Sequence, residues 1–318
     1  MIKRILLSEY LILILCAAYS GVAMLAVPGF ASLSNLQTVA GYMLPILVAS
    51  VGLTFVLIIG GIDLSLTSVI ALCSVLGATL MSQEAGWPAG QPWSTPAGVT
   101  GMLLLGSLLG GLNGLNVTLL RIPAFMATLA MMMFGSGWAI WWTQSGKIFG
   151  LPASFTQLGQ NPWLSLLIVG SVVAAAHYTL SRTLYGRWLY AIGLNARAAF
   201  ISGVPVKKAV FAAYVISGLF AGLSAVLLTA SLETGDPEMA RTALLDIIGA
   251  TVIGGTSLYG GKGKVTWTVF GVLFLALLDN SLNMIDLSFF FITMVKGAVI
   301  LLAALLDTLR NQWGGALT

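Results

Sequence analysis

The side chains of this sequence that could do chemistry are few and widely spaced. Ten carboxylates, one histidine and two cysteines are distributed over 318 residues, mostly at the ends of apolar segments. They form no metal-ligand cluster, and the sequence contains neither a GxSxG motif nor a phosphate-binding loop. We therefore expect no catalytic residue, no metal and no cofactor in this chain, and we predict that it is not an enzyme.

One carboxylate interrupts an otherwise apolar stretch. Asp63 is the only charged residue in residues 10–83, and it follows Gly60 and Gly61 and precedes Ser65. At membrane depth it would cost about 2.5–3.5 kcal/mol, so it requires a partner, a cavity or an interface. Two interpretations are open. The residues could form a capped turn at the cytoplasmic surface, because glycines permit tight turns and Asp and Ser accept free helix amides, or they could lie on a translocation path or hinge.

A second candidate site lies in segment 182–208, which carries five basic residues. Asn195 is a good helix N-cap, Gly203 can end a helix in the left-handed conformation, and Pro205 discourages its continuation. These three residues predict a two-turn helix that lies outside the membrane. Its surface residues are small, which suits docking into a partner's groove. The alternative is a basic connector lying on anionic lipid headgroups. The residues assigned to docking are Gly193, Asn195, Ala196, Ala199, Ser202, Gly203 and Pro205.

A third unusual segment covers residues 245–263 and is rich in glycine. Few helices tolerate so much glycine, so the pair Gly254 and Gly255 indicates a span whose end is unwound or closely packed. A flexible turn bearing Lys262 and Lys264 would follow it. We count both glycines as candidates for the translocation path or a hinge, and a plain glycine-rich loop is the alternative.

The elements that must position these residues are apolar helices. Hydrophobic residues make up 58% of the chain and charged residues 8%, against about a quarter charged in a soluble domain. Uncharged runs such as residues 10–62 hold one or two crossings each, because a helix needs about 20 apolar residues to span a bilayer. The runs lack the alternating pattern of barrel strands. The sequence predicts an all-α, polytopic membrane helix bundle that forms a single domain over residues 1–318.

The apolar pattern predicts ten crossings, the first of them a retained span and not a cleaved signal peptide. The eighth is short and could be a broken or re-entrant helix. The ten segments are 10–27, 38–60, 64–82, 97–120, 123–143, 163–181, 209–231, 244–258, 265–283 and 287–306.

The basic residues orient these segments, because Lys and Arg accumulate in short cytoplasmic loops. With both termini in the cytoplasm, only Lys147 and Arg241 fall in outside loops, and Lys296 falls within the last span. The net charge of +4 is thereby explained without nucleic acid. The basic residues on the cytoplasmic side are then Lys3, Arg4, Arg121, Arg182, Arg187, Arg197, Lys207, Lys208, Lys262, Lys264 and Arg310.

Four segments occur together in one order over most of the chain: residues 60–65 (GGIDLS), 193–204, 252–261 (beginning VIGGTS) and 295–307 (beginning VKGAV). In these segments the sequence resembles the ribose-type permeases of ABC importers, within the binding-protein-dependent permeases for branched-chain amino acids and ribose. Four motifs at spacings consistent with one topology are far more specific than any one of them alone.

The resemblance implies a permease in the bacterial inner membrane that carries a sugar or sugar-like solute by ATP-driven alternating access. It implies as partners a second permease, identical or not, a cytoplasmic ATPase subunit that binds the ATP, an extracytoplasmic sugar-binding protein and membrane lipid. The helix from Asn195 to Gly203 would then be the coupling element that docks on the ATPase. The sequence departs from the family's usual pattern at Leu66-Thr67, Arg197 and Leu244, and each departure could alter the choice of partner or substrate.

The main alternative is an ion-coupled secondary transporter, which would place ionisable residues mid-membrane to bind a coupling ion. The candidates are Asp63, Asp279 and Lys296. We expect Asp279 and Lys296 to form a structural pair between the last two spans. A channel is disfavoured because the sequence has neither a ring of charges nor a filter-like segment.

Overall fold

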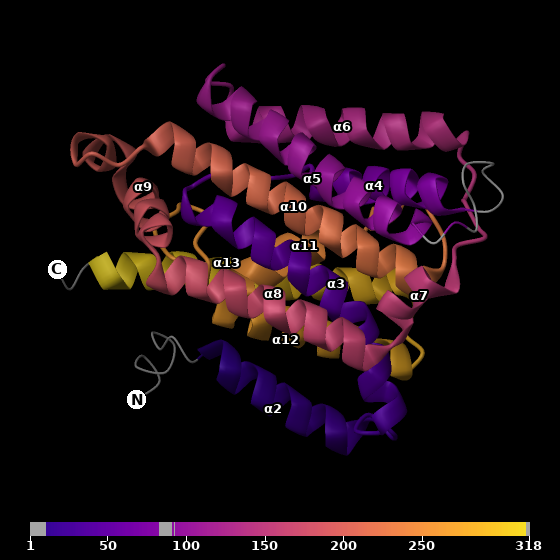
Figure 1. Cartoon of the computed structure of the whole chain (residues 1–318). Helices are drawn as coiled ribbons and strands as arrows, with labels where there is room; N and C mark the ends of the chain where they lie inside the picture. Colours follow the sequence, from indigo (N-terminus) through magenta and orange to yellow (C-terminus); the bar gives the residue numbers. More distant parts are fainter. Residues whose placement is uncertain (1–10, 83–90, 92, 316–318) are drawn as a thin grey trace.

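The computed structural model of the chain is a bundle of α-helices, which for the most part run alongside one another (Figure 1). It describes residues 11–82, 91 and 93–315. These ranges contain no strand, and Ile148 and Gly235 form an isolated β-bridge. The all-α prediction is confirmed. The helices are α2 (Leu11–Ala26), α3 (Leu33–Ile58), α4 (Leu66–Met81), α5 (Ser94–Thr118), α6 (Ala124–Thr143), α7 (Ala153–Gln160), α8 (Pro162–Arg182), α9 (Leu184–Ile201), α10 (Val206–Leu232), α11 (Leu244–Ile253), α12 (Val265–Met284) and α13 (Phe289–Gly315).

Helix length and composition are those of a polytopic membrane protein. Six of the described helices are long and apolar enough to cross a bilayer, namely α3, α5, α6, α8, α10 and α12. Shorter apolar stretches of 10–17 residues occur in α2, α4, α11 and α13. These ten helices coincide with the ten predicted segments, so the prediction of a helical polytopic membrane protein is confirmed.

α11 is shorter than the eighth predicted segment. That segment runs over residues 244–258, but α11 ends at Ile253 after 10 residues. At about 1.5 Å per residue such a helix covers only about half of the hydrocarbon core. Gly254 follows as its C-cap, and Gly255 has a φ of +84° that favours glycine. The segment therefore enters the bundle without crossing it as one helix, which was one of the two expected arrangements.

Two helical segments are missing from the sequence-based prediction. α7 lies between Pro152 and Asn161, in a connection predicted to have no element. α9 begins at Leu184, so that most of segment 182–208 is helical, whereas we expected a connector with one short helix. Both segments are more polar than the spans, and a search for long apolar runs does not detect them.

α3 is the central helix of the bundle. All of its residues from Leu44 to Ile58 are buried, as expected for a helix that is apolar on every side. α8, α10, α11 and α12 all pack against it. Pro45 lies inside this helix, and its carbonyl oxygen accepts a hydrogen bond of 2.8 Å from the hydroxyl of Ser224 on α10.

Glycines allow α5 and α10 to pack backbone against backbone. A Cβ atom at Gly106 would lie 2.3 Å from the carbonyl oxygen of Gly218, and one at Gly110 would lie 2.2 Å from that of Tyr214. Gly114 is similarly close to the Phe211 backbone, at 3.1 Å. The spacing of these three glycines predicts close helix packing, and the structure confirms it.

We expect Gly110→Ala to lower the thermal stability of the purified chain in detergent. The added methyl group meets a backbone atom that cannot rotate away, and overpacking of this kind costs about 1–3 kcal/mol. Gly111→Ala is the matched control, because its Cβ would meet nothing closer than the Val215 side chain at 3.6 Å. Equal melting temperatures for the two variants would contradict the packing argument.

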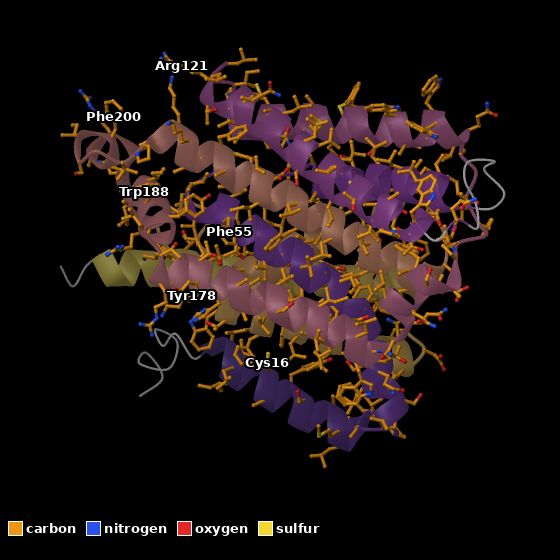
Figure 2. The ribbon with its side chains drawn as sticks, viewed as in Figure 1. Cys16, Phe55, Arg121, Tyr178, Trp188 and Phe200 are labelled. Atoms are coloured by element: carbon orange, nitrogen blue, oxygen red, sulfur yellow. The ribbon has the colours of Figure 1, made fainter. Side chains whose placement is uncertain are left out.

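The basic residues gather at one end of the bundle, which we call the basic end. Arg121, in the α5–α6 connection, and α9 both lie there (Figure 2). The start of α2 and the end of α13 lie at the same end (Figure 1). Lys3 and Arg4, on which the orientation also rests, are outside the described residues. We call the other end, where α7 lies, the outer end, after the orientation predicted from the sequence.

Candidate functional site

The helix predicted after Asn195 forms with the predicted signals at both of its ends. Asn195 breaks α9 with a non-helical backbone (φ −162°, ψ 101°), and its side-chain oxygen accepts the amide of Ala198 at 2.9 Å. Gly203 follows the helix with φ +85°, and Pro205 occupies the N-cap position of α10. The local structure predicted for this segment is confirmed. We call residues 196–201 the terminal helix of α9.

The terminal helix presents large apolar side chains at the basic end. Leu194 just before it and Phe200 and Ile201 within it are each more than 70% exposed. Figure 2 shows Phe200 at this end of the bundle. Arg197 is exposed beside them. We predicted a surface of small residues, and this is only partly right: Ala196, Ser202 and Gly203 are exposed, but Ala199 is buried.

Gly193, at the base of the terminal helix, packs directly on two other backbone segments. A Cβ atom at this position would lie 1.8 Å from the carbonyl oxygen of Ile58 and 2.4 Å from the amide nitrogen of Gly261. The Gly261 amide also donates a 2.8 Å hydrogen bond to the Ile58 oxygen. The end of α3, the terminal part of α9 and the α11–α12 connection therefore meet at one point, which we call the glycine junction.

Two further contacts tie the glycine junction together. A Cβ atom at Gly260 would lie 2.8 Å from the amide nitrogen of Gly60 and 3.0 Å from the carbonyl oxygen of Gly193. The hydroxyl of Tyr190 donates a 2.7 Å hydrogen bond to the carbonyl oxygen of Gly263. Each of the three segments stands out in the sequence, but their contact with one another could not be read from it.

Gly254 and Gly255 do not belong to the glycine junction. A Cβ atom at Gly254 would lie 2.6 Å from the carbonyl oxygen of Trp267, so this residue packs against α12. Gly255 has no atom within 4 Å of a Cβ position and serves the turn that ends α11. The closely packed span end that the sequence indicates is therefore present, and it lies apart from the contact between α3 and α9.

Asp63 is a buried carboxylate that joins three helices. It is 1% exposed, and its oxygens accept hydrogen bonds from the Ser65 hydroxyl at 2.6 Å, the Ser65 amide at 3.1 Å and the Ser217 hydroxyl at 2.8 Å. Asn113 of α5 donates to the Ser65 hydroxyl oxygen at 2.8 Å. The carboxylate is thus surrounded by hydroxyl and amide donors, as a buried polar group requires.

These contacts correct one interpretation of the α3–α4 break. Ser217 lies 11 residues after Val206, or roughly 16 Å along α10, so Asp63 is well inside the bundle and not in a turn at its surface. The Asp63 carboxylate accepts a hydrogen bond from the Ser65 amide, as a capping residue does at the start of a helix. The Ser65 side chain makes no such capping bond to α4. Gly61 is also enclosed, because its Cβ would lie 2.7 Å from the Tyr214 hydroxyl oxygen.

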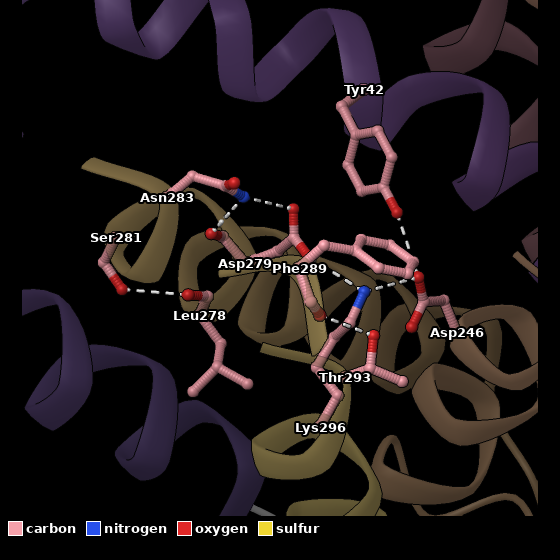
Figure 3. Close-up of polar contacts among 9 residues, drawn as sticks. All are labelled: Tyr42, Asp246, Leu278, Asp279, Ser281, Asn283, Phe289, Thr293 and Lys296. Atoms are coloured by element: carbon pink, nitrogen blue, oxygen red, sulfur yellow. Dashed lines mark hydrogen bonds and ion pairs between the residues drawn. The ribbon is translucent and has the colours of Figure 1, made fainter. Parts of the chain in front are cut away.

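A second buried group of charges links the last three helices to α3 (Figure 3). The Lys296 ammonium lies 2.9 Å from a carboxylate oxygen of Asp246 and 2.8 Å from one of Asp279. Tyr42 donates to Asp246 at 2.9 Å, and Asn283 donates to Asp279 at 3.1 Å. The expected pair of Asp279 and Lys296 is confirmed. Asp246 and Tyr42 were missed, because nothing in the sequence places α11 and α3 beside α13.

The outer end is closed by loop contacts. Ile148 and Gly235 exchange two backbone hydrogen bonds of 2.9 Å, and the adjacent Lys147 and Asp236 form an ion pair of 2.8 Å. The Lys147 ammonium donates a hydrogen bond to the Asp236 carboxylate, and this contact raises the pKa of Lys147 above its usual value. These contacts join the α6–α7 connection to the segment after α10.

Two cavities in the bundle are lined by different sets of helices. The α3/α8 cavity, of about 350 Å³, is lined by α3, α7, α8 and α10. The α4/α6 cavity, of about 440 Å³, is lined by α4, α6 and the segment leading into α11. Within the described ranges no three His, Cys, Asp or Glu side chains come together as they would around a metal ion.

Comparisons with known proteins agree over most of the chain. The family model described as "Branched-chain amino acid transport system / permease component" matches residues 35–304. The ribose import permease protein RbsC of Haemophilus influenzae is 35% identical over 288 residues, which cover 88% of this chain and 87% of that protein. The L-arabinose ABC transporter permease protein AraH of Azospirillum brasilense is 30% identical, with coverages of 91% and 84%. The xylose transport system permease protein XylH of Escherichia coli is 29% identical, with coverages of 83% and 82%. No solved structure matches.

Proposed function

The chain belongs to the family of branched-chain amino acid transport system permease components, and on that premise we propose that it is the membrane permease subunit of a bacterial ABC importer. The proposed cargo is a sugar or sugar-like solute, carried across the inner membrane by ATP-driven alternating access. The relatives are named as permeases for ribose, L-arabinose and xylose, so a pentose is the first substrate to test.

The observation that carries this proposal is the backbone contact between the end of α3 and Gly193, which lies in α9 just before the terminal helix. An exposed apolar surface at Phe200 and Ile201 suits docking into a groove of a cytoplasmic ATPase subunit. Gly193, eight residues before Ile201, touches Ile58 with no side chain between them. A push on the terminal helix therefore acts on α3 directly.

We propose that this contact carries movement from the ATPase to the α3–α4 break. Ile58 is five residues before Asp63, which accepts a hydrogen bond from Ser217 of α10. The neighbouring Ser65 accepts one from Asn113 of α5. A displaced α3 end must either take the break with it or strain these hydrogen bonds. Packed interfaces of this kind shift between discrete arrangements, which is what alternating access requires.

The charge distribution supports an orientation with the basic end in the cytoplasm. Both chain termini then lie on the cytoplasmic side, and the ATPase subunit meets α9 there. The outer end, with α7 and the loop contacts around Lys147, would receive the sugar from an extracytoplasmic binding protein. A second permease, identical or different, completes the transport path in this proposal.

The test is reconstitution of the chain in liposomes with its ATPase and binding protein. We expect uptake of radiolabelled ribose, arabinose or xylose that requires ATP and both partner proteins. The isolated chain should be inert. Uptake by the isolated chain in response to a proton or sodium gradient would overturn the proposal and establish the secondary transporter.

The structure gives the secondary transporter little support. The three ionisable candidates already have partners, since Asp63 accepts hydrogen bonds and Lys296 bridges Asp279 and Asp246. Asp63, Asp279 and Lys296 line neither the α3/α8 cavity nor the α4/α6 cavity.

A further inference from the structure

The α4/α6 cavity extends from the α3–α4 break toward the outer end. Its deep wall includes Thr67, two residues after Ser65, and its outer rim includes Glu238 and Arg241 in the segment that leads into α11. It therefore connects the proposed moving element with the face at which solute would arrive. The α3/α8 cavity reaches no further along α3 than Pro45 and is separated from the break by the buried half of that helix.

Hydroxyl groups in the α4/α6 cavity are available to a ligand. Within the described part of the chain, neither Thr67 nor Ser136 makes a side-chain hydrogen bond. Thr128 and Thr143, on the same helix as Ser136, instead donate to backbone carbonyls four residues earlier, at 2.8 and 3.1 Å. Helical hydroxyls usually bond in that way, so the free hydroxyl of Ser136 is a departure that favours a ligand-facing role.

The rim adds donors and acceptors without adding net charge. Glu238 and Arg241 form an ion pair with each other, and both side chains are at least half exposed. Methionines 132, 133 and 239 supply adaptable apolar walls. This combination of sparse hydroxyls, one carboxylate, one guanidinium and apolar walls suits an uncharged, polyhydroxylated solute, whose C–H faces and hydroxyls need both kinds of contact.

We propose that the α4/α6 cavity is part of the sugar's passage and that Ser136, Thr67, Glu238 and Arg241 contact the sugar there. The inference rests on the proposed function and assigns it a place in the structure. Two of the positions at which the sequence departs from the family's usual pattern, Thr67 and Leu244, line this cavity. Thr67 and Leu244 are therefore the residues of this cavity that we expect to determine which sugar is carried.

Substituted cysteines test the proposal in the full complex of permease, ATPase and binding protein in liposomes. The native Cys16 and Cys73 are buried, so a membrane-impermeant thiol reagent should leave wild-type uptake of D-ribose unchanged. Labelling of Ser136→Cys should remove most of the uptake, and added D-ribose should slow the labelling. Gln37→Cys, in the α3/α8 cavity, is the matched control and should keep its uptake after labelling.

Either of two results would overturn the assignment. The first is that Ser136→Cys keeps its full uptake after treatment with the reagent, whether or not the cysteine has reacted. The second is that only the labelled Gln37→Cys variant loses uptake. Arg241→Gln, at a position whose side chain is 74% exposed, should raise the ribose concentration for half-maximal uptake without changing ATPase association. An unchanged half-saturation would likewise count against the proposal. If the wild-type complex moves no sugar at all, the proposed function fails, whereas failure of the cavity assignment leaves wild-type uptake intact.

Discussion

Gly193→Ala is expected to abolish most ATP-driven sugar uptake while the chain still inserts and still binds its ATPase. The new methyl group would lie 1.8 Å from the Ile58 oxygen and 2.4 Å from the Gly261 nitrogen. Both are backbone atoms, so the α9 backbone at Gly193 must move away from α3 and take the terminal helix with it. Association survives in this argument because Phe200 and Ile201, which face outward, are unchanged.

The measurement is uptake per ATP hydrolysed, together with co-purification of the ATPase. The local overpacking should also cost about 1–3 kcal/mol of stability, so melting in detergent must be recorded alongside transport. Gly170→Ala on α8 is the control, since a Cβ there meets nothing within 4 Å. Normal uptake per ATP in Gly193→Ala would exclude the glycine junction as the route of coupling.

The local signals of the docking segment could be predicted because they depend on neighbours in sequence. Asn195 caps three residues ahead and Gly203 needs only its own left-handed backbone, so both were identified correctly. The packing role of Gly106, Gly110 and Gly114 follows for the same reason, since a four-residue spacing places glycines on one helix face whatever the partner.

The depth of a residue within the bundle, and its contacts with residues far away in the sequence, could not be predicted in this way. Asp63 fits a capped surface turn equally well until Ser217, 154 residues later, is found beside it. Gly193 and Ile58 are marked separately in the sequence, and only the fold makes them neighbours. The length of α11 was ambiguous because Gly254 and Gly255 permit either an unwound end or a turn, and tertiary packing against Trp267 decides between them.

The cavity residues were invisible for a different reason. Ser136 lies in an apolar run, where a single hydroxyl normally hydrogen-bonds to a backbone carbonyl of its own helix. No sequence pattern shows that the Ser136 hydroxyl lacks this bond. Thr67 and Leu244 were noted only as departures from a family pattern. Their common position on one cavity wall depends on how α4 and the start of α11 face α6.

The second large effect is expected for Lys296→Met, which should strongly destabilise the chain. Lys296 is 13% exposed and lies between two carboxylates that are 12% and 22% exposed, so its removal leaves Asp246 buried and Asp279 half-buried without a cation. Breaking a buried ion pair from one side costs about 3–5 kcal/mol. The expected result is a large fall in melting temperature in detergent and a low yield of folded protein.

Two comparisons separate a charge effect from a packing effect. Lys147→Met removes an ion pair whose lysine is 53% exposed, and surface pairs of this kind contribute little to stability, so its melting temperature should barely change. A triple variant combines Lys296→Met with Asp246→Asn and Asp279→Asn. It should regain much of the lost stability, because no uncompensated charge remains. A triple variant no more stable than Lys296→Met would show that the lysine acts through packing. The charge cluster would then not be what holds α11 and α12 against α13.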